Sequence, residues 1–308
     1  MKKLKTLIFI CFCVAAVMYG TMRIRIKSAQ DLVPPVVTVD SDTIELSVQA
    51  EDADYLSGVT AADNRDGDVT DSLVVAEKSN FISPGRFKVT YAAFDSHNNV
   101  GYATRTVNFT DYTPPRFSMT RPFRYLTSDS YSLLDGMSAE DAVDGDVTNG
   151  IRYSYGKSTD ATHADITYEV TNSFGDTSQL TVPCRIYSDS AEYAKDTPQL
   201  TNYIVYTTPG QAVDVLSLVD GIWRNGKTVL FDDQNGEGYT LADIRVDDTA
   251  VDYNTPGVYT ITVGLAADPE TGDTASSGNP VVTVDTTDTT DLYVVVEEET
   301  NGGSQSEQ

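Results

Sequence analysis

Two short acidic runs contain the residue types that could bind a cation or transfer a proton. Residues 61–73 read AADNRDGDVTDSL and residues 139–151 read AEDAVDGDVTNGI, so the pentapeptide DGDVT occurs twice. Carboxylate oxygens are the ligands that calcium prefers, and paired carboxylates carry out general acid–base catalysis. Three interpretations therefore compete: a calcium site, a pair of catalytic acids, or a turn that recurs because a whole domain recurs.

The calcium interpretation fails in its EF-hand form. An EF-hand loop needs oxygen ligands at positions 1, 3 and 5 and a glycine at position 6. Gly67 at position 6 puts Ala62 at position 1, and Gly145 there puts Ala142 at position 3. A calcium site of another kind stays open, because clustered carboxylates need a cation or full solvation to offset their repulsion. Its ligands would be the aspartates of each run, namely Asp63, Asp66 and Asp68 in the first and Asp141, Asp144 and Asp146 in the second.

A turn explains both runs more simply, and it is the interpretation we prefer. In an Asp-Gly turn the glycine supplies the unusual φ angle, and aspartate side chains accept hydrogen bonds from nearby backbone N–H groups. The Val-Thr pair that follows would begin the next strand. On this interpretation the protein needs no cofactor, and calcium remains the alternative.

Catalysis is the least favoured interpretation, and we expect that the protein is not an enzyme. With 46 acidic residues in the chain, close carboxylate pairs arise by chance. A glycosidase would also need a cleft that positions its acid and its nucleophile. His97 and His163 belong to a hairpin and to the start of a strand, and the chain has no GxSxG, HExxH or glycine-rich phosphate motif.

The acidic runs lie inside a longer repeat that must position them. The Pro-Pro pairs of VPPVVTV and TPPRFSM are 80 residues apart, and residues 87–101 and 164–176 are both alternating strands that end in a polar, glycine-containing hairpin. Residues 255–273 repeat this pattern in a more divergent form. Several short alternating strands in each stretch of roughly 80 to 100 residues, with turns between them, are typical of β-sandwiches.

The first of these repeats resembles a known family. The run GVTAADNRDGDVTDSLVV, the later ISPGRFKVTYAAFDSHNNVG and the flanking Pro-Pro pairs are similar to the bacterial surface Ig-like repeat, the type known from pesticidal crystal proteins. The resemblance is clearest in residues 33–110 and weaker in residues 113–188, and in the third repeat it is confined to the Pro-Gly strand. It implies an Ig-like fold in an exported bacterial protein and no particular activity.

We therefore predict an all-β chain of tandem Ig-like β-sandwich domains that follow one N-terminal transmembrane or signal helix. The predicted segments are the N-terminal segment 1–27, Ig-like domain 1 at 33–111, Ig-like domain 2 at 113–188, a divergent Ig-like domain 3 at 196–298 and a disordered tail at 299–308.

Charge and hydropathy predict where the protein resides. Residues 1–27 hold six cations and no acid around an uncharged stretch from Thr6 to Met22, so the remainder carries a net charge of −31. Such a surface repels phosphate backbones, which excludes nucleic acid as a partner. We predict an uncleaved single-pass anchor in the cell membrane with the bulk of the chain outside. The alternative is a cleaved signal peptide and a secreted protein.

Three other features have simple structural interpretations. Cys184 belongs to the inward face of an alternating strand and is predicted to be a buried small hydrophobic residue. Residues 120–134 interleave arginine with aromatics, a pattern that would suit a glycan or protein contact but is more simply a strand with one exposed face. Trp223 is predicted to be a core or turn anchor rather than a sugar platform.

The predicted function is that of a cell-surface Ig-like repeat protein. It would act without catalysis as an adhesion or interaction module, or as a spacer, whose partner is an extracellular protein or glycan. Two alternatives remain: a secreted carbohydrate-binding or calcium-dependent module, and an accessory subunit of a membrane complex.

Overall fold

The computed structural model describes residues 2–29, 31–129, 132–156, 162–225, 227–231, 239–266 and 289–298, with only the backbone at 2–3 and 24–29. The chain divides into two compact units, Met1–Tyr112 and Thr113–Gln308. The predicted tail at 299–308, and part of the third repeat's hairpin, lie outside the described residues.

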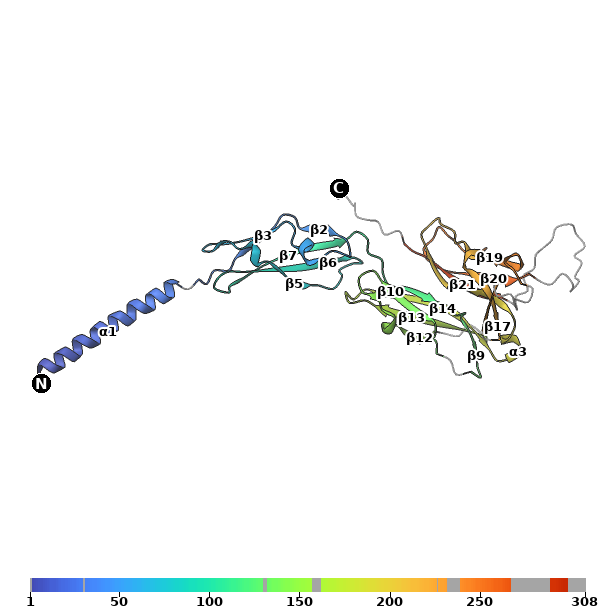
Figure 1. Cartoon of the computed structure of the whole chain (residues 1–308), viewed down its shortest axis with the longest axis horizontal. Coiled ribbons are helices and arrows are strands. Elements are labelled where there is room, and N and C mark those ends of the chain that lie inside the picture. The colour runs from blue at the N-terminus through green and yellow to red at the C-terminus, as the bar shows by residue number, and fades with distance from the viewer. Residues whose placement is uncertain are drawn as a thin grey trace, which may run out of the picture. The chain divides into compact units, whose positions relative to one another are not determined.

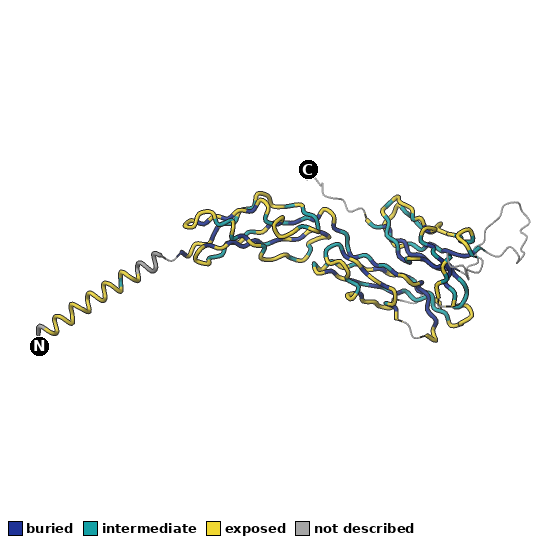
Figure 2. The backbone as a smooth tube through the Cα atoms, in the orientation of Figure 1, coloured by how far each residue is buried: buried dark blue, intermediate teal, exposed yellow. Residues whose placement is uncertain are grey.

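The first element, α1 (Lys2–Ala29), is one long apolar helix (Figure 1). Its window Leu4–Arg23 has 20 residues and a mean hydropathy of 1.9, and none of it is buried in the protein. Figure 2 colours almost all residues of this window as exposed. A stretch of this length and composition is sufficient to cross a bilayer, and a signal sequence passes the same test.

The rest of the first unit consists of two β-sheets. The three-stranded sheet has the order β1 (Val36–Val39), β3 (Val59–Asp63) and β4 (Gly67–Asp68). The four-stranded sheet has the order β2 (Thr43–Leu46), β7 (Val100–Phe109), β6 (Arg86–Phe94) and β5 (Val74–Lys78), with β2 parallel to β7. Two short helices, α2 (Asp52–Tyr55) and the 3-10 helix η1 (Thr70–Ser72), connect the strands.

The second unit contains the same layout twice. The second sandwich of the chain has sheets β11-β10-β8 and β12-β13-β14-β9, and the third sandwich has sheets β15-β17-β18 and β16-β21-β20-β19. As in the first unit, the strand of each four-stranded sheet that comes first along the chain is parallel to the one that comes last: β9 pairs with β14, and β16 pairs with β21. The strands of the second sandwich are β8 (Arg116–Met119), β9 (Arg124–Leu126), β10 (Met137–Asp141), β11 (Gly145–Asp146), β12 (Arg152–Tyr155), β13 (His163–Thr171) and β14 (Thr177–Tyr187).

The strands of the third sandwich are β15 (Thr197–Leu200), β16 (Ile204–Thr207), β17 (Val219–Arg224), β18 (Lys227–Leu230), β19 (Ile244–Asp247), β20 (Gly257–Leu265) and β21 (Thr289–Val296). Short helices of this unit are η2 (Thr148–Gly150), α3 (Ser190–Tyr193), η3 (Val215–Leu218) and η4 (Leu241–Asp243).

Strand periodicity places the cores. In β6, the alternating side chains of Phe87, Val89 and Tyr91 are fully buried, as the period-two pattern predicts. In β3, the inward series Val59 and Ala61 ends at Asp63, so the same alternation points a carboxylate inward. The prediction of an all-β chain of tandem sandwiches after an N-terminal helix is confirmed.

The two sandwiches of the second unit share one hydrophobic core. The ring of Tyr293 packs edge-on against that of Phe123, with centroids 5.2 Å apart. The backbone N–H of Tyr203 donates to the carbonyl of Met119 at 2.8 Å. Since β21 supplies Tyr293 and the segment before β9 supplies Phe123, side chains of both sandwiches fill the same interior.

The structure confirms two of the three simple structural interpretations and contradicts the third. Cys184 and Trp223 are buried, as predicted, and burial raises the pKa of the Cys184 thiol to about 12. The prediction of one exposed face for the strand in residues 120–134 is wrong, because all three residues of β9 are buried. Tyr187 and Tyr193 stack on the guanidinium of Arg124, which also donates to Thr197 Oγ1 at 2.9 Å.

Candidate cation-binding site

The first acidic run forms the turn between β3 and β4. Asp63 Oδ1 accepts hydrogen bonds from the backbone N–H groups of Arg65 at 2.7 Å and Asp66 at 3.0 Å. Gly67 has a φ of 75°, in the left-handed region that favours glycine. The loop therefore owes its shape to one aspartate that accepts from the turn and one glycine that reverses the chain.

The second acidic run forms the same turn between β10 and β11. Asp141 Oδ1 accepts from the N–H groups of Val143 and Asp144, both at 2.9 Å, and Gly145 has a φ of 69°. The two copies of DGDVT are thus equivalent in backbone conformation as well as in sequence.

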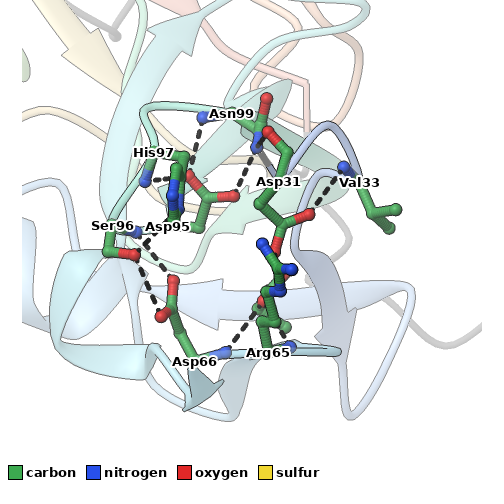
Figure 3. Close-up of polar contacts among 9 residues, drawn as sticks. Asp31, Val33, Arg65, Asp66, Asp95, Ser96, His97 and Asn99 are labelled. Atoms are coloured by element: carbon green, nitrogen blue, oxygen red, sulfur yellow. Dashed lines mark hydrogen bonds and ion pairs between the residues drawn. The ribbon is translucent and has the colours of Figure 1, made fainter. Parts of the chain in front are cut away.

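The middle aspartate of each run braces the turn against the neighbouring hairpin. Asp66 accepts from the backbone N–H and the hydroxyl of Ser96, at 2.8 and 3.0 Å, as Figure 3 shows. Asp144 accepts from the same two groups of Ser173, at 2.6 and 2.7 Å. Both carboxylates are therefore occupied as hydrogen-bond acceptors.

The last aspartate of each run accepts a hydrogen bond from the first residue of the 3-10 helix that follows it. Asp68 accepts from the N–H of Thr70, and Asp146 accepts from the N–H of Thr148, both at 2.9 Å. The three aspartates of one run consequently serve three separate acceptor roles. They do not converge on a common point, and each of the six candidate ligands has a role in its turn.

A different set of carboxylates does converge, in the first unit. Asp31, Asp63 and Asp95 are all buried, and each offers a carboxylate oxygen within 4.8 Å of the other two. In the described part of the chain, this is the one group of three or more such ligands close enough to share a metal ion. Its members come from the segment before β1, the end of β3 and the turn after β6.

Local contacts fix Asp31 in this cluster. Its Oδ1 accepts from the N–H of Val33 at 3.1 Å, and its carbonyl accepts from Asn99 Nδ2, also at 3.1 Å (Figure 3). Gly101 lies so near that a Cβ there would stand 1.8 Å from the carbonyl oxygen of Pro35. The absence of a side chain at position 101 is therefore what allows the segment before β1 to lie against the hairpin of β6 and β7.

Asp95 shapes the hairpin turn that carries it. Its Oδ1 accepts from the N–H groups of His97 at 2.8 Å and Asn99 at 2.7 Å, and its Oδ2 accepts from Asn99 Nδ2 at 2.6 Å. Asn99 thus links Asp95 to the backbone of Asp31, as Figure 3 shows.

Two oxygens of the cluster lack a donor. Oδ2 of Asp31 and Oδ2 of Asp63 are buried and have no hydrogen-bond partner among the described residues. Both side chains belong to residues that are more than nine-tenths buried, with exposures of 6% and 7%. The nearest cation is Arg65, whose Nε is 3.8 Å from Asp31 Oδ2 and whose side chain is 44% exposed. A buried acceptor without a donor is unfavourable, which makes these oxygens candidate ligand atoms.

Hydrogen bonds lower the pKa values of two members of the cluster, Asp63 and Asp95. The N–H groups of Asp66 and Arg65 lower the pKa of Asp63, although burial and the nearby charge of Asp95 raise it. Burial is the largest influence on the pKa of Asp95 and raises it, but the bonds from Asn99 and His97 together bring it below its usual value. The hydrogen bonds therefore favour the charged forms.

The second sandwich has the same turns without the carboxylate cluster. Asn172 stands where the first unit has Asp95, and its Oδ1 accepts from the N–H groups of Phe174 and Asp176. Its Nδ2 donates to Asp141 Oδ2 at 3.1 Å. The oxygen that corresponds to the unpartnered Oδ2 of Asp63 is thereby satisfied by a neutral amide.

The third sandwich places the opposite charge at this position. Arg224 ends β17 as Asp63 ends β3, and its Nε donates to Asp196 Oδ1 at 2.9 Å. Asp196 lies in the segment that leads into β15, as Asp31 lies in the segment that leads into β1. The charges at this position thus differ among the three sandwiches. Among the described residues, only the first sandwich keeps three carboxylates together there.

Sequence reasoning found Asp63 and missed Asp31 and Asp95. The signal available was the alignment of the repeats, in which FDSHNN of the first copy aligns with TNSFGD of the second. That comparison places an aspartate at 95 against an asparagine at 172. It could not by itself bring either residue next to the DGDVT turn.

The comparisons with known proteins identify the first sandwich. Residues 44–109 match the family of the bacterial surface protein Ig-like domain. An uncharacterized 81.3 kDa protein of Acholeplasma phage L2 is 27% identical over 129 residues, which are 39% of this chain and 17% of that protein. The chain thus matches less than a fifth of this relative's length.

Solved structures with similar regions are distant. The CBM51-2 and INT domains of Clostridium perfringens ZmpB, solved in complex with GlcNAc, match at 16% identity over 47% of this chain and 26% of that one, with a TM-score of 0.21. Human CDH23 EC21-23 matches at 14% identity over 86% of this chain and 100% of that one, with a TM-score of 0.18.

Proposed function

We propose that this protein, whose first sandwich is a bacterial surface Ig-like domain, is a membrane-anchored surface protein that acts without catalysis as a spacer or interaction module. Helix α1 would hold it in the cell membrane, and the sandwiches would extend outside the cell. The observation that carries the proposal is the exposed apolar window Leu4–Arg23, which is followed within a few residues by a β-sandwich domain.

The charge distribution supports the proposed orientation. Cations flank the apolar window on both sides, whereas the remainder of the chain has a large excess of acids. An acidic, strand-rich chain is suited to the outer surface, where it stays soluble and repels anionic polymers. The cations by themselves do not set the orientation, because three precede the uncharged stretch and three follow it.

The shared core of the second unit supports a mechanical role. Besides the packing of Tyr293 on Phe123, Arg185 donates to both carboxylate oxygens of Asp291 at 2.9 Å, and Arg116 pairs with Glu297. Sandwiches joined by core packing and by ion pairs resist bending more than sandwiches joined by a linker alone. Such a body suits a spacer that keeps a binding face at a fixed distance.

The experiment is a test of anchoring in a bacterial host that produces the full chain. We expect the protein in the membrane pellet after extraction with alkaline carbonate, with an uncleaved N-terminus by mass spectrometry and with the sandwiches open to external protease. A mature N-terminus near Gly20, with the protein in the medium, would favour the secreted alternative instead.

A pair of matched variants separates anchoring from folding. Val14 lies near the middle of the apolar window, and an arginine there costs about 3 kcal/mol on membrane insertion. Val14→Arg should therefore reduce the membrane fraction. Val36→Arg introduces the same charge at an exposed valine of β1 and should leave the membrane fraction unchanged.

A further inference from the structure

We propose that Asp31, Asp63 and Asp95 bind one divalent cation, and that calcium is the preferred ion. This site is not the one that the acidic runs suggest, because two of its three ligands lie outside them. The proposal is independent of the function proposed above, since it depends on buried carboxylates and not on the membrane helix.

The spacing of the oxygens fits one calcium ion. Calcium binds oxygen ligands at about 2.3 to 2.6 Å, so ligands on opposite sides of it are at most about 5 Å apart. The three carboxylate oxygens lie within 4.8 Å of one another. Magnesium usually takes one or two carboxylates and keeps several waters, so three converging carboxylates favour calcium. Water and backbone carbonyls would complete its shell.

The local charge also matches a divalent ion. Three carboxylates have a formal charge of −3, and the pairing of Arg65 with Asp31 contributes +1. The remaining charge of −2 is that which one calcium ion neutralises. The partly exposed Arg65 does not occupy the interior of the cluster, because its Nε is 3.8 Å from Asp31 Oδ2.

The repeat within the chain shows what happens when the charge is absent. In the second sandwich, the amide of Asn172 satisfies Asp141 Oδ2. With Asp95 in the corresponding place, Asp63 Oδ2 faces another carboxylate and has no donor among the residues described. Replacing an amide by a carboxylate at a buried position is unfavourable unless a cation binds there.

The site would act on the junction between the helix and the first sandwich. Asp31 is two residues beyond Ala29, the last residue of α1, whereas Asp63 and Asp95 belong to two turns of the sandwich. A bound cation would therefore tie the segment that follows the helix to the sandwich. Bound calcium would stiffen this junction.

The test is calcium binding to the full chain in detergent micelles, stripped with EDTA and measured by equilibrium dialysis at about 0.15 M salt to screen the acidic surface. We expect one equivalent of calcium with a dissociation constant of about 1 mM or tighter. Asp95→Asn keeps an Oδ1 that can accept from the N–H groups of its turn, as Asn172 does in the second sandwich, so it should fold, and it should weaken binding at least tenfold.

Two further variants make the test specific. Asp63→Asn should also weaken binding at least tenfold, whereas Asp141→Asn changes the corresponding residue of the second sandwich and should leave binding unchanged. The absence of saturable binding up to about 10 mM calcium would overturn the proposal. Binding that persists in both Asp95→Asn and Asp63→Asn would also overturn it, because the cation would then lie elsewhere.

Discussion

The side-chain amide of Asn172 donates to Asp141 Oδ2 at 3.1 Å, at the position where the first sandwich sets Asp95 beside Asp63. Both hairpins use the residue at this position in the same way, as an acceptor for two backbone N–H groups of its own turn. The turn therefore needs only an oxygen, which aspartate and asparagine both supply. The second oxygen of Asp95 accepts from the neutral amide of Asn99, so the turn does not balance the negative charge of Asp95 and a cation would do so.

The first prediction concerns Asp95→Asn in the absence of calcium. The new amide would donate to Asp63 Oδ2 and remove a like charge, and this gain should exceed the loss of the bond that Asp95 Oδ2 accepts from Asn99 Nδ2. Thermal unfolding in EDTA should therefore occur at a higher temperature than in the unmodified protein. Circular dichroism would measure the midpoint. A lower midpoint in EDTA would show that the carboxylate at position 95 is needed for structure alone.

The second prediction is the reverse exchange in the second sandwich. Asn172→Asp removes the donor to Asp141 Oδ2 and sets two carboxylates together, so it should lower the free energy of unfolding by about 1 to 3 kcal/mol. Urea unfolding in EDTA measures the loss. Ser173→Ala is the control, because it leaves both members of the Asn172–Asp141 pair in place. A loss no larger than that of the control would contradict the importance assigned to the amide.

The strands of the first core, such as β6, were predictable because they are amphipathic with period two. Phe87, Val89 and Tyr91 alternate with polar neighbours, and the repeat of this pattern predicts the tandem sandwiches. The common core of the second and third sandwiches was not predictable from local pattern. It depends on Tyr293 and Phe123, which are 170 residues apart in sequence, and an alternating strand does not indicate which other sandwich it touches.

The candidate site was only partly predictable for a related reason. Spacing in sequence groups Asp63 with Asp66 and Asp68, but in a hairpin these side chains point to different partners. Alternation along β3 points Asp63 inward, toward Asp31 and Asp95 from other segments. Tertiary structure thus selects one acid from each of three segments, which no count of nearby acids reveals.

The third prediction concerns pH. Asp63, Asp68, Asp95 and Asp146 all have pKa values below their usual range, chiefly because the folded turns donate hydrogen bonds to the charged forms. A lowered folded pKa contributes stability above the unfolded pKa of about 3.9, and this stability is lost as the pH falls through the folded value. The urea midpoint in EDTA should therefore be nearly constant from pH 7 to about 5 and should fall below about pH 4.

A variant tests the origin of this acid sensitivity. Asp68→Asn can still accept from the N–H of Thr70 but does not titrate, so its midpoint should fall less between about pH 4 and 3 than that of the unmodified chain. A midpoint that rises on acidification would contradict the assignment, because it would mean that repulsion among acids outweighs these hydrogen bonds.

The fourth prediction concerns the ion pair between β14 and β21. Arg185 and Asp291 have side-chain exposures of 24% and 14%, so Arg185→Ala leaves a largely buried carboxylate unpaired and should cost about 3 kcal/mol in urea unfolding. Arg121 and Asp135 form an exposed pair, 3.6 Å apart, and Arg121→Ala should cost less than about 1 kcal/mol. Equal losses would mean that the Arg185 pair adds nothing to the shared core.

The fifth prediction separates two glycines by the reason each is needed. A Cβ at position 101 would lie 1.8 Å from the carbonyl oxygen of Pro35, so Gly101→Ala must displace the segment before β1, at a cost of about 3 kcal/mol. A Cβ at position 67 would meet nothing within 4 Å, and Gly67→Ala should cost only about 1 kcal/mol for its positive φ.

Because the segment that ends at Pro35 also carries Asp31, Gly101→Ala should weaken calcium binding as well, whereas Gly67→Ala should retain it. Parallel urea unfolding and calcium dialysis would measure both effects. Unchanged binding in a folded Gly101→Ala protein would mean that the position of Asp31 does not depend on this close approach.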